Sequence, residues 1–198
     1  MIGIIDYGAG NLGSVLKAVT NLGYEAKVIK TPQEIDEVDA YILPGVGAFC
    51  QAMENIKPLI PALNKNVLEK KKYILGICLG LQMLFDKSYE DGEYEGLGYI
   101  KGEVKKLDVE YKIPHMGWNE IIENEKDEIT KDVEGFVYFV HSYYVDPEDF
   151  SLVKLYSEYG RKVPALVRSG NIVGMQFHPE KSAKTGMQLL KNFLEMVK

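Results

Sequence analysis

The chain has 198 residues, 46% of them hydrophobic, and a net charge of −6, which suits one compact domain with its own core. Nucleic-acid binding normally needs a basic face, so the negative charge disfavours it, and no apolar run reaches the roughly 18 residues of a membrane helix. Two cysteines are too few for a disulfide framework, so we expect a reducing, cytoplasmic location.

Strand-like apolar runs alternate with helical patterns through the first half of the chain. The predicted strands cover residues 2–5, 25–29, 40–43 and 73–77. The predicted helices cover residues 12–22, 49–56, 58–72 and 79–85. This alternation predicts an α/β fold with a mixed, mostly parallel central sheet and helices on both faces.

The second half is rich in strand-like runs joined by short polar turns. We predict strands over residues 99–107, 136–140, 151–158, 165–168 and 172–177, and a last helix over 182–197. Several of these strands are expected to extend the same sheet in antiparallel fashion. The acidic stretch 120–134 is interpreted as a solvated excursion, and without a linker or repeat the prediction is a single domain over 1–198.

A cysteine between two glycines follows one of the buried strands. Gly76-Ile77-Cys78-Leu79-Gly80 is the thiol version of a nucleophile elbow, in which glycines allow a sharp turn and close strand–helix packing. Such a turn exposes the nucleophile at the carboxyl end of its strand, and the Leu79 N–H points to where an oxyanion would form. The alternative is a buried structural cysteine beside packing glycines.

A histidine and a glutamate follow another predicted strand, in Gln176-Phe177-His178-Pro179-Glu180. His178 is expected at the same sheet edge as Cys78, with Glu180 folded back to orient the imidazole. Taken alone, this string is also typical of a surface turn before a helix. Together the two strings predict a Cys78–His178–Glu180 triad for acyl transfer on amides or esters.

With these strings, the chain resembles the class I glutamine amidotransferases over its whole length. More narrowly, it resembles the glutaminase subunits of imidazole glycerol phosphate synthase, an enzyme of histidine biosynthesis. The strings that carry the resemblance, beyond the triad, are Asp6-Tyr7-Gly8-Ala9-Gly10-Asn11, Pro44-Gly45-Val46-Gly47-Ala48-Phe49, Pro114-His115-Met116-Gly117-Trp118-Asn119 and His178-Pro179-Glu180-Lys181-Ser182.

The resemblance implies that the chain hydrolyses glutamine through a thioester on Cys78. It further implies that the ammonia passes to a partner cyclase, a (β/α)8 barrel that makes imidazole glycerol phosphate and aminoimidazole carboxamide ribotide. No metal or organic cofactor is expected, and the three scattered histidines show no metal-ligand spacing.

The resemblance also suggests roles around the triad. The Val46 N–H is expected to be the second oxyanion donor, with Gly47 allowing that peptide to rotate; the alternative is an ordinary strand-to-helix turn. The residues expected to bind glutamine are Gly47, Gln82, His141, Ser142 and Tyr143. For Gln82, the alternative is an exposed polar residue of a helix. The residues expected at the partner interface are Asn11, Met116, Trp118 and Lys181.

Gly8-Ala9-Gly10-Asn11-Leu12-Gly13 matches the dinucleotide-binding fingerprint, but the second predicted strand ends at Ile29-Lys30 without the acidic residue that binds ribose. We therefore interpret the loop as a tight turn near the site. Three functions remain open as alternatives. They are a glutaminase of pyridoxal phosphate, anthranilate or guanylate synthesis, a catalytically silent binding subunit, and a peptidase-like or esterase-like hydrolase.

Overall fold

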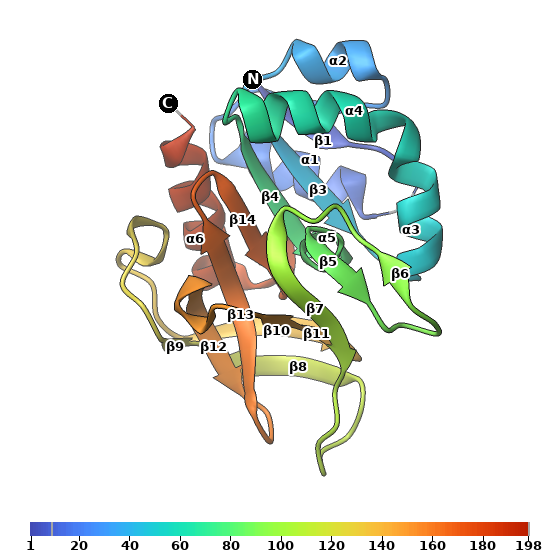
Figure 1. Ribbon diagram of the computed structural model, residues 1–198. Coiled ribbons are helices and arrows are strands. Elements are labelled where there is room, and N and C mark those ends of the chain that lie inside the picture. The colour runs from blue at the N-terminus through green and yellow to red at the C-terminus, as the bar shows by residue number, and fades with distance from the viewer. Residues whose placement is uncertain (9, 198) are drawn as a thin grey trace.

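The computed structural model describes residues 1–8 and 10–197, so that Ala9 of the glycine-rich string and Lys198 lie outside the described residues (Figure 1). An eight-stranded sheet runs through the centre in the order β2-β1-β3-β4-β14-β13-β12-β9. Its first five strands are parallel, and the last three are added antiparallel. Their bounds are β2 Ala26–Ile29, β1 Ile2–Ile5, β3 Ala40–Gly45, β4 Tyr73–Cys78, β14 Ile172–Met175, β13 Lys162–Ser169, β12 Val153–Glu158 and β9 Ile122–Glu123.

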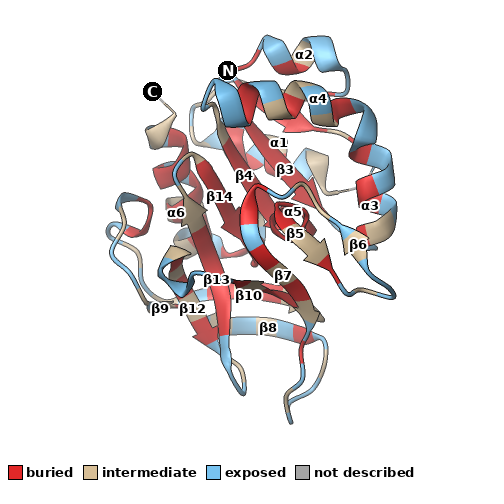
Figure 2. Cartoon of the chain, in the orientation of Figure 1, coloured by how far each residue is buried: buried red, intermediate tan, exposed pale blue. Residues whose placement is uncertain are grey.

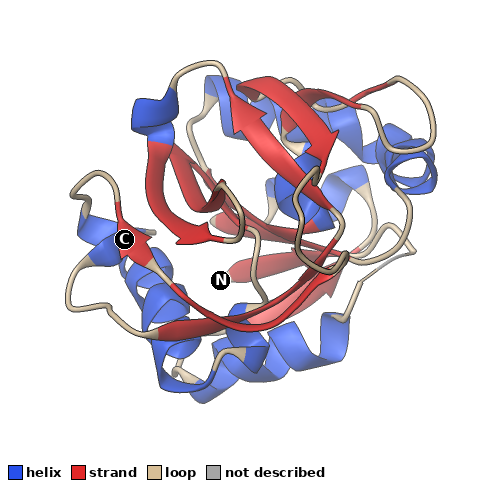
Figure 3. Ribbon diagram, turned by 90° about the horizontal axis from the view of Figure 1, so that it is seen from below, coloured by secondary structure: helices blue, strands red, loops and turns tan. Residues whose placement is uncertain are grey.

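Helices cover both faces of this sheet (Figure 3). On one face lie α1, Leu12–Asn21, and α6, Ala183–Met196, whose apolar residues share one core cluster with the sheet. On the other lie α2, Pro32–Asp36, α3, Phe49–Ile56, α4, Ile60–Leu63, and α5, Leu79–Met83. The predicted α/β class and the mixed, mostly parallel sheet are confirmed.

The inner strands are buried on both faces, which is why they appear in the sequence as nearly unbroken apolar runs (Figure 2). Along β3, Tyr41 and Leu43 point into the core beneath α3–α5, whereas Ile42 points into the core beneath α1 and α6. The sheet therefore holds the carboxyl ends of its strands rigidly from two sides.

Two smaller sheets complete the fold. One pairs β8, His115–Glu120, with β10, Phe136–His141; the other has the order β11-β7-β5-β6. The bounds of that second set are β11 Tyr143–Pro147, β7 Ile100–Lys106, β5 Phe85–Ser88 and β6 Tyr94–Glu95. The expected antiparallel extension of the central sheet holds for β12 and β13, whereas β7 and β10 belong to these separate sheets.

Three predicted segments differ in detail. Residues 58–72 do not form one regular helix. A 3-10 turn over Lys57–Leu59, α4 and a wide π turn over Asn64–Glu69 follow one another. The prolines at 58 and 61 lack the backbone donor, which explains the interruption in the first of these turns. The helix from Leu79 ends at Met83, and the chain continues as β5.

The acidic stretch 120–134 is not simply solvated. Ile129 is fully buried, and Arg168 holds Asp127 and Glu128 with Nη–carboxylate distances of 2.6 and 2.9 Å. The segment also contributes β9 to the central sheet. The buried apolar residues among the charged ones hold this segment against the domain, and its charge does not keep it in solvent.

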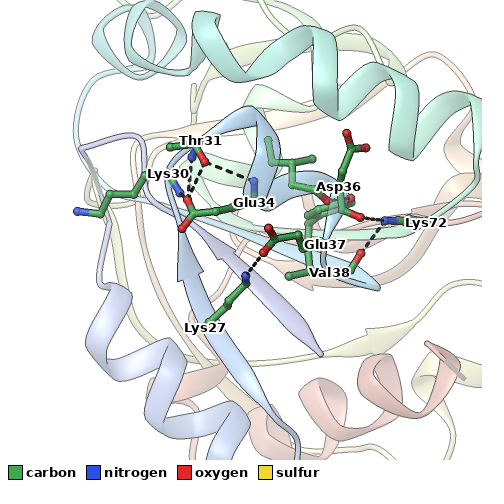
Figure 4. Close-up of polar contacts among 10 residues, drawn as sticks. Lys27, Lys30, Thr31, Glu34, Asp36, Glu37, Val38 and Lys72 are labelled. Carbon is green, nitrogen blue, oxygen red and sulfur yellow. Dashed lines mark hydrogen bonds and ion pairs between the residues drawn. The ribbon is translucent and has the colours of Figure 1, made fainter.

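The short helix α2 was not predicted. Thr31 and Glu34 form a reciprocal capping box at its start, and the ammonium of Lys72 donates to the carbonyls of Asp36, at 3.2 Å, and Val38, at 2.7 Å (Figure 4). The contacts of Lys72, which directly precedes β4, hold the β2–β3 connection in place.

Candidate active site

Three neighbouring parallel strands end together at one edge of the central sheet. Gly45 of β3 is in register with Cys78 of β4, and Met175 of β14 is in register with Ile77. The turns that follow these strands therefore meet, as expected at the carboxyl edge of a parallel sheet.

Cys78 lies in a strained turn between β4 and α5. Its φ of 55° and ψ of −109° belong to a region that non-glycine residues rarely adopt. The packing around it leaves no room for side chains: a Cβ at Gly80 would lie 1.8 Å from the Leu43 carbonyl oxygen, and one at Gly76 would lie 2.5 Å from the Gly80 oxygen. The glycines on both sides of the cysteine thus fix the position of the sulfur.

His178 and Glu180 form a buried pair beyond the end of β14. Nδ1 of His178 lies 3.0 Å from Oε1 of Glu180, and their side chains are 3% and 2% exposed. The turn is held by strand β10, since the His178 N–H donates to the Tyr138 carbonyl at 3.2 Å. Burial alone would lower the pKa of His178, but the Cys78 sulfur and the Glu180 carboxylate outweigh it and raise the pKa to about 9.

The other imidazole nitrogen, Nε2 of His178, has no hydrogen-bond partner among the residues that the structure describes. His178 and Cys78 line the same cavity. With Nδ1 engaged by Glu180, the free nitrogen is the one available to accept the thiol proton.

The cavity at this edge has a volume of about 370 Å³, within the range of small-molecule sites. Seven predicted site residues line it together with Cys78 and His178: Val46, Gly47, Leu79, Gln82, His141, Ser142 and Tyr143. Glu180 supports the imidazole from behind. Three further lining residues were not among the predicted site residues, namely Glu90, Pro114 and Val140.

The turn after β3 forms one side of this cavity. Val46 is 46% exposed, and Gly47 has a φ of 103° with open space where a Cβ would stand. On the other side of the turn, the buried hydroxyl of Tyr7 donates to the Pro44 carbonyl at 2.9 Å. Gly10 of the glycine-rich loop lies against Pro44 as well, which agrees with a tight turn near the site.

Glu90 connects this turn to the cavity wall. Its Oε2 accepts a hydrogen bond from the Phe49 N–H at 2.9 Å, at the first residue of α3, where Ala48 offers no side-chain cap. Burial raises the pKa of Glu90 in spite of that bond. The local sequence, Ser88-Tyr89-Glu90-Asp91, carries no signal that distinguishes this carboxylate from a surface one.

Two buried histidines lie at one wall of the cavity: His141 lines it, and His115 packs against His141. Nδ1 of His141 is 2.8 Å from the Tyr143 carbonyl and therefore carries the proton, so Nε2 of His141 accepts from Nδ1 of His115 at 3.1 Å. Burial lowers the pKa of His141 to about 3 and that of His115 to about 4. Both rings are therefore neutral at pH 7, and they support the wall without adding charge beside His178.

The residues predicted for a partner interface lie outside the cavity. Met116 and Trp118 are 58% and 54% exposed on β8, on the same face as Phe136 of β10, and Lys181 is also exposed. Asn11 occupies the N-cap position of α1, but its side chain makes no capping hydrogen bond.

The profile of the family described as "Glutamine amidotransferase class-I" matches residues 3–197. Among curated relatives, "Imidazole glycerol phosphate synthase subunit HisH" of Carboxydothermus hydrogenoformans is 50% identical, with 98% of each chain covered. The protein of the same name from Bacillus subtilis is 45% identical over 99% of this chain and 96% of the relative. The one from Aquifex aeolicus is 49% identical over 96% of this chain and 94% of the relative.

Solved structures share the fold at much lower identity. The crystal structure described as "glutamine amidotransferase" has a TM-score of 0.79 at 20% identity and covers 99% of this chain and 98% of its own. The structure of PurLQS from Thermotoga maritima has a TM-score of 0.78 at 20% identity, covering 100% and 98%. The chain therefore belongs to the class-I glutamine amidotransferase family, in the branch of the imidazole glycerol phosphate synthase HisH subunits.

Proposed function

We propose that this chain hydrolyses glutamine to glutamate and ammonia at Cys78, His178 and Glu180, and delivers the ammonia to a cyclase subunit of imidazole glycerol phosphate synthase. The observation that carries the catalytic part is the cavity in which a thiol at a strained turn meets an imidazole braced by a buried carboxylate. The pathway follows from relatives of the same length that carry that name.

The reaction proceeds from the state in which the Cys78 thiol proton has passed to Nε2 of His178, a transfer that the raised pKa of His178 favours. The sulfur attacks the side-chain amide carbon of glutamine, and the oxygen of that amide becomes an oxyanion. The backbone N–H groups of Val46 and Leu79 stabilise it, since both residues line the cavity beside the sulfur. His178 then passes its proton to the nitrogen, which leaves as ammonia.

The second half-reaction releases glutamate. Neutral His178 takes a proton from water, the hydroxide attacks the thioester carbon, and the C–S bond breaks to restore the sulfur. Glu180 keeps the imidazole in one orientation through both steps, because its bond to Nδ1 leaves only Nε2 to move protons.

The remaining lining residues bind the amino-acid end of glutamine. Both hydrogens of the Gln82 amide are engaged, with the Tyr143 carbonyl and with Gln176, so Gln82 offers only its oxygen, which suits the substrate's ammonium group. The Glu90 carboxylate also lines the cavity and suits the same ammonium group. Gly47 and the segment His141–Tyr143 complete the enclosure, whose volume suits a free amino acid better than a peptide.

The exposed face of β8 and β10 is the partner surface. Cross-strand pairs Tyr138–Trp118 and Val140–Met116 place apolar side chains in a row that ends at Val140, a residue of the cavity wall. We place the cyclase barrel against this row and against Asn11 and Lys181. In that position the barrel would lie next to the point where ammonia is formed. Large exposed apolar side chains such as Trp118 are typical anchors of interfaces.

The whole chain is the catalytic domain, and we place it in the cytoplasm because Cys50 and Cys78 are both free thiols. Among the described residues, every helix is too short or too polar to cross a membrane.

The test is Cys78→Ala in the complex with the cyclase. We expect glutamine hydrolysis to vanish while the synthase still works with added ammonia, because only the sulfur is removed. Cys50→Ala, a half-buried thiol outside the cavity, is the matched control and should keep full activity. Normal glutamine hydrolysis by Cys78→Ala would overturn the assignment, and recovery of a partner other than a cyclase barrel would overturn the pathway.

A further inference from the structure

Gln176 is a fully buried amide beside the nucleophile, one residue before the Phe177-His178 corner. It follows Met175, which is in register with Ile77, so Gln176 lies level with Cys78, directly after the end of the neighbouring strand β14. Its own N–H donates to the Ala165 carbonyl of β13 at 2.9 Å, which fixes its backbone from the other side. A buried side-chain amide is destabilising unless its polar atoms are paired, so its contacts are informative.

Which end of the Gln176 amide faces the sulfur is determined by the Tyr143 carbonyl, through a hydrogen bond to Gln82 and a second one from Gln82 to Gln176. The Tyr143 carbonyl can only accept, so the Gln82 group 3.1 Å from it must be the NH₂ group. The same NH₂ group donates to Oε1 of Gln176 at 3.3 Å. The opposite end of the Gln176 amide is therefore its NH₂ group, which points to the Cys78 sulfur at 3.8 Å.

Besides His178, two polar neighbours of the sulfur have opposite preferences. The Val140 carbonyl, 3.9 Å away, accepts a hydrogen bond from the neutral thiol and repels a thiolate. The Gln176 NH₂ group donates to the sulfur, and donors are most effective when the acceptor is charged. Of these two neighbours, only Gln176 favours the form that attacks glutamine.

We propose that Gln176 is a further catalytic residue, whose side-chain amide donates to the Cys78 sulfur and stabilises the thiolate, with Gln82 as the positioning residue that sets its direction. The thiol proton goes to Nε2 of His178, and the same amide stabilises the sulfur again when the thioester breaks. The catalytic meaning rests on the proposed function, but the ionisation of the sulfur is measurable without glutamine.

Several titratable groups surround the sulfur. Tyr7, after β1, has a pKa raised by burial and by the charge of Cys78, and His178 faces the sulfur from the end of β14. Glu90 and His141 stand on the cavity walls. All four groups are present in every variant below. A difference in the pH midpoint between variants therefore reports the effect of the side-chain amides of Gln176 and Gln82.

The test uses the full-length chain with Cys50→Ser in every sample, so that iodoacetamide reports on Cys78 alone. The alkylation rate is measured against pH for this parent, for Gln176→Leu and for Gln176→Met. Loss of the donor should raise the pH midpoint by about one unit and lower the rate at neutral pH about tenfold. Gln82→Leu keeps the donor but frees its direction, so we expect a smaller shift of about half a unit in the same sense.

An unchanged midpoint in either Gln176 variant that retains the circular dichroism of the parent would overturn the proposal, as would a larger shift in Gln82→Leu than in Gln176→Leu. The two Gln176 variants differ in branching, so that one of them provides the measurement if the other fails to fold. A shifted midpoint in a protein whose parent complex cannot hydrolyse glutamine would contradict the proposed function and support only the stabilisation of the thiolate by Gln176.

Discussion

The two turns that meet at the site lie side by side but are held in opposite ways. At the end of β4, Cys78 is 7% exposed, and a Cβ on the nearby Gly80 would overlap the Leu43 oxygen. At the end of β3, Val46 is 46% exposed, and a Cβ on Gly47 would meet nothing within 4 Å. The nucleophile is therefore fixed by packing, whereas no packing encloses the proposed oxyanion donor itself.

The exposed turn is nevertheless anchored at both ends. The Tyr7 hydroxyl holds the Pro44 carbonyl, and the Glu90 carboxylate holds the Phe49 N–H. The residues between these anchors are free to reorient a peptide without disturbing the core, so this turn is the adjustable half of the site. The following predictions test that division.

Gly80→Ala should have the largest effect, since the added methyl group overlaps backbone on the packed side. We expect a loss of about 3 kcal/mol or more in the free energy of unfolding, measured by denaturant titration, and no glutaminase activity in the complex. Gly13→Ala, at an exposed position of α1 with open space, is the control and should be neutral or stabilising. A well-folded, active Gly80→Ala chain would show that the elbow is not fixed by packing.

Gly47→Ala should separate activity from stability. The new residue disfavours a φ of 103°, so we expect kcat for glutamine to fall about 100- to 1,000-fold through the lost donor geometry. The free energy of unfolding should fall by only about 1–2 kcal/mol, since the turn is exposed. Gly23→Ala, at a φ of 86° with open space after the end of α1, has a comparably positive φ outside the cavity and should keep its kcat. Equal kcat values in the two variants would contradict the role of this turn.

Glu180→Gln should lower kcat about 10- to 100-fold, because the imidazole loses the charge that orients it. The pKa of His178 is raised from 6.5 to about 9, so its protonated form stabilises the fold below about pH 6.5. That stabilisation is lost as the pH rises through about 9, and the variant, with a lower pKa, should lose less over this window. Denaturant titrations at several pH values measure how steeply the free energy of unfolding changes with pH, with Glu195→Gln on α6 as a surface control. An identical pH dependence in the parent and in Glu180→Gln would exclude the His178–Glu180 pair as its cause.

Tyr7→Phe should have the smallest effect. One buried hydrogen bond to Pro44 is lost, which we expect to lower the free energy of unfolding by about 1 kcal/mol and to change kcat a few-fold. Tyr41→Phe removes a similar bond to the Ile35 carbonyl away from the site, so it should match the stability loss without changing kcat. The stability and kcat of both variants are compared by thermal melts and enzyme kinetics. Equal kcat values would show that the Tyr7 hydroxyl does not support the turn.

The predictable parts of the structure are those that depend on continuous patterns. The buried parallel strands, the helices α1, α3 and α6 and the Cys78 turn follow from apolar runs and glycine spacing. The separate sheets of β7 and β10 were not predicted, because the pattern of a half-buried strand does not specify its partner.

The missed site residues are those whose roles depend on contacts across the fold. Glu90 reaches a helix start 41 residues away, and Gln176 acquires its direction from the Tyr143 carbonyl through Gln82. Gln176 did carry a signal, since a glutamine inside an apolar strand end before His178 has to be paired. Glu90 carried none.

The most direct measurement is the mass of the partner-bound chain, quenched in acid during turnover of glutamine and then mapped by peptide. We expect a γ-glutamyl group on Cys78 that is absent from Cys50 and strongly reduced in a His178→Ala chain. Rapid glutamine hydrolysis with no adduct on Cys78, or with the adduct on another residue, would contradict this expectation.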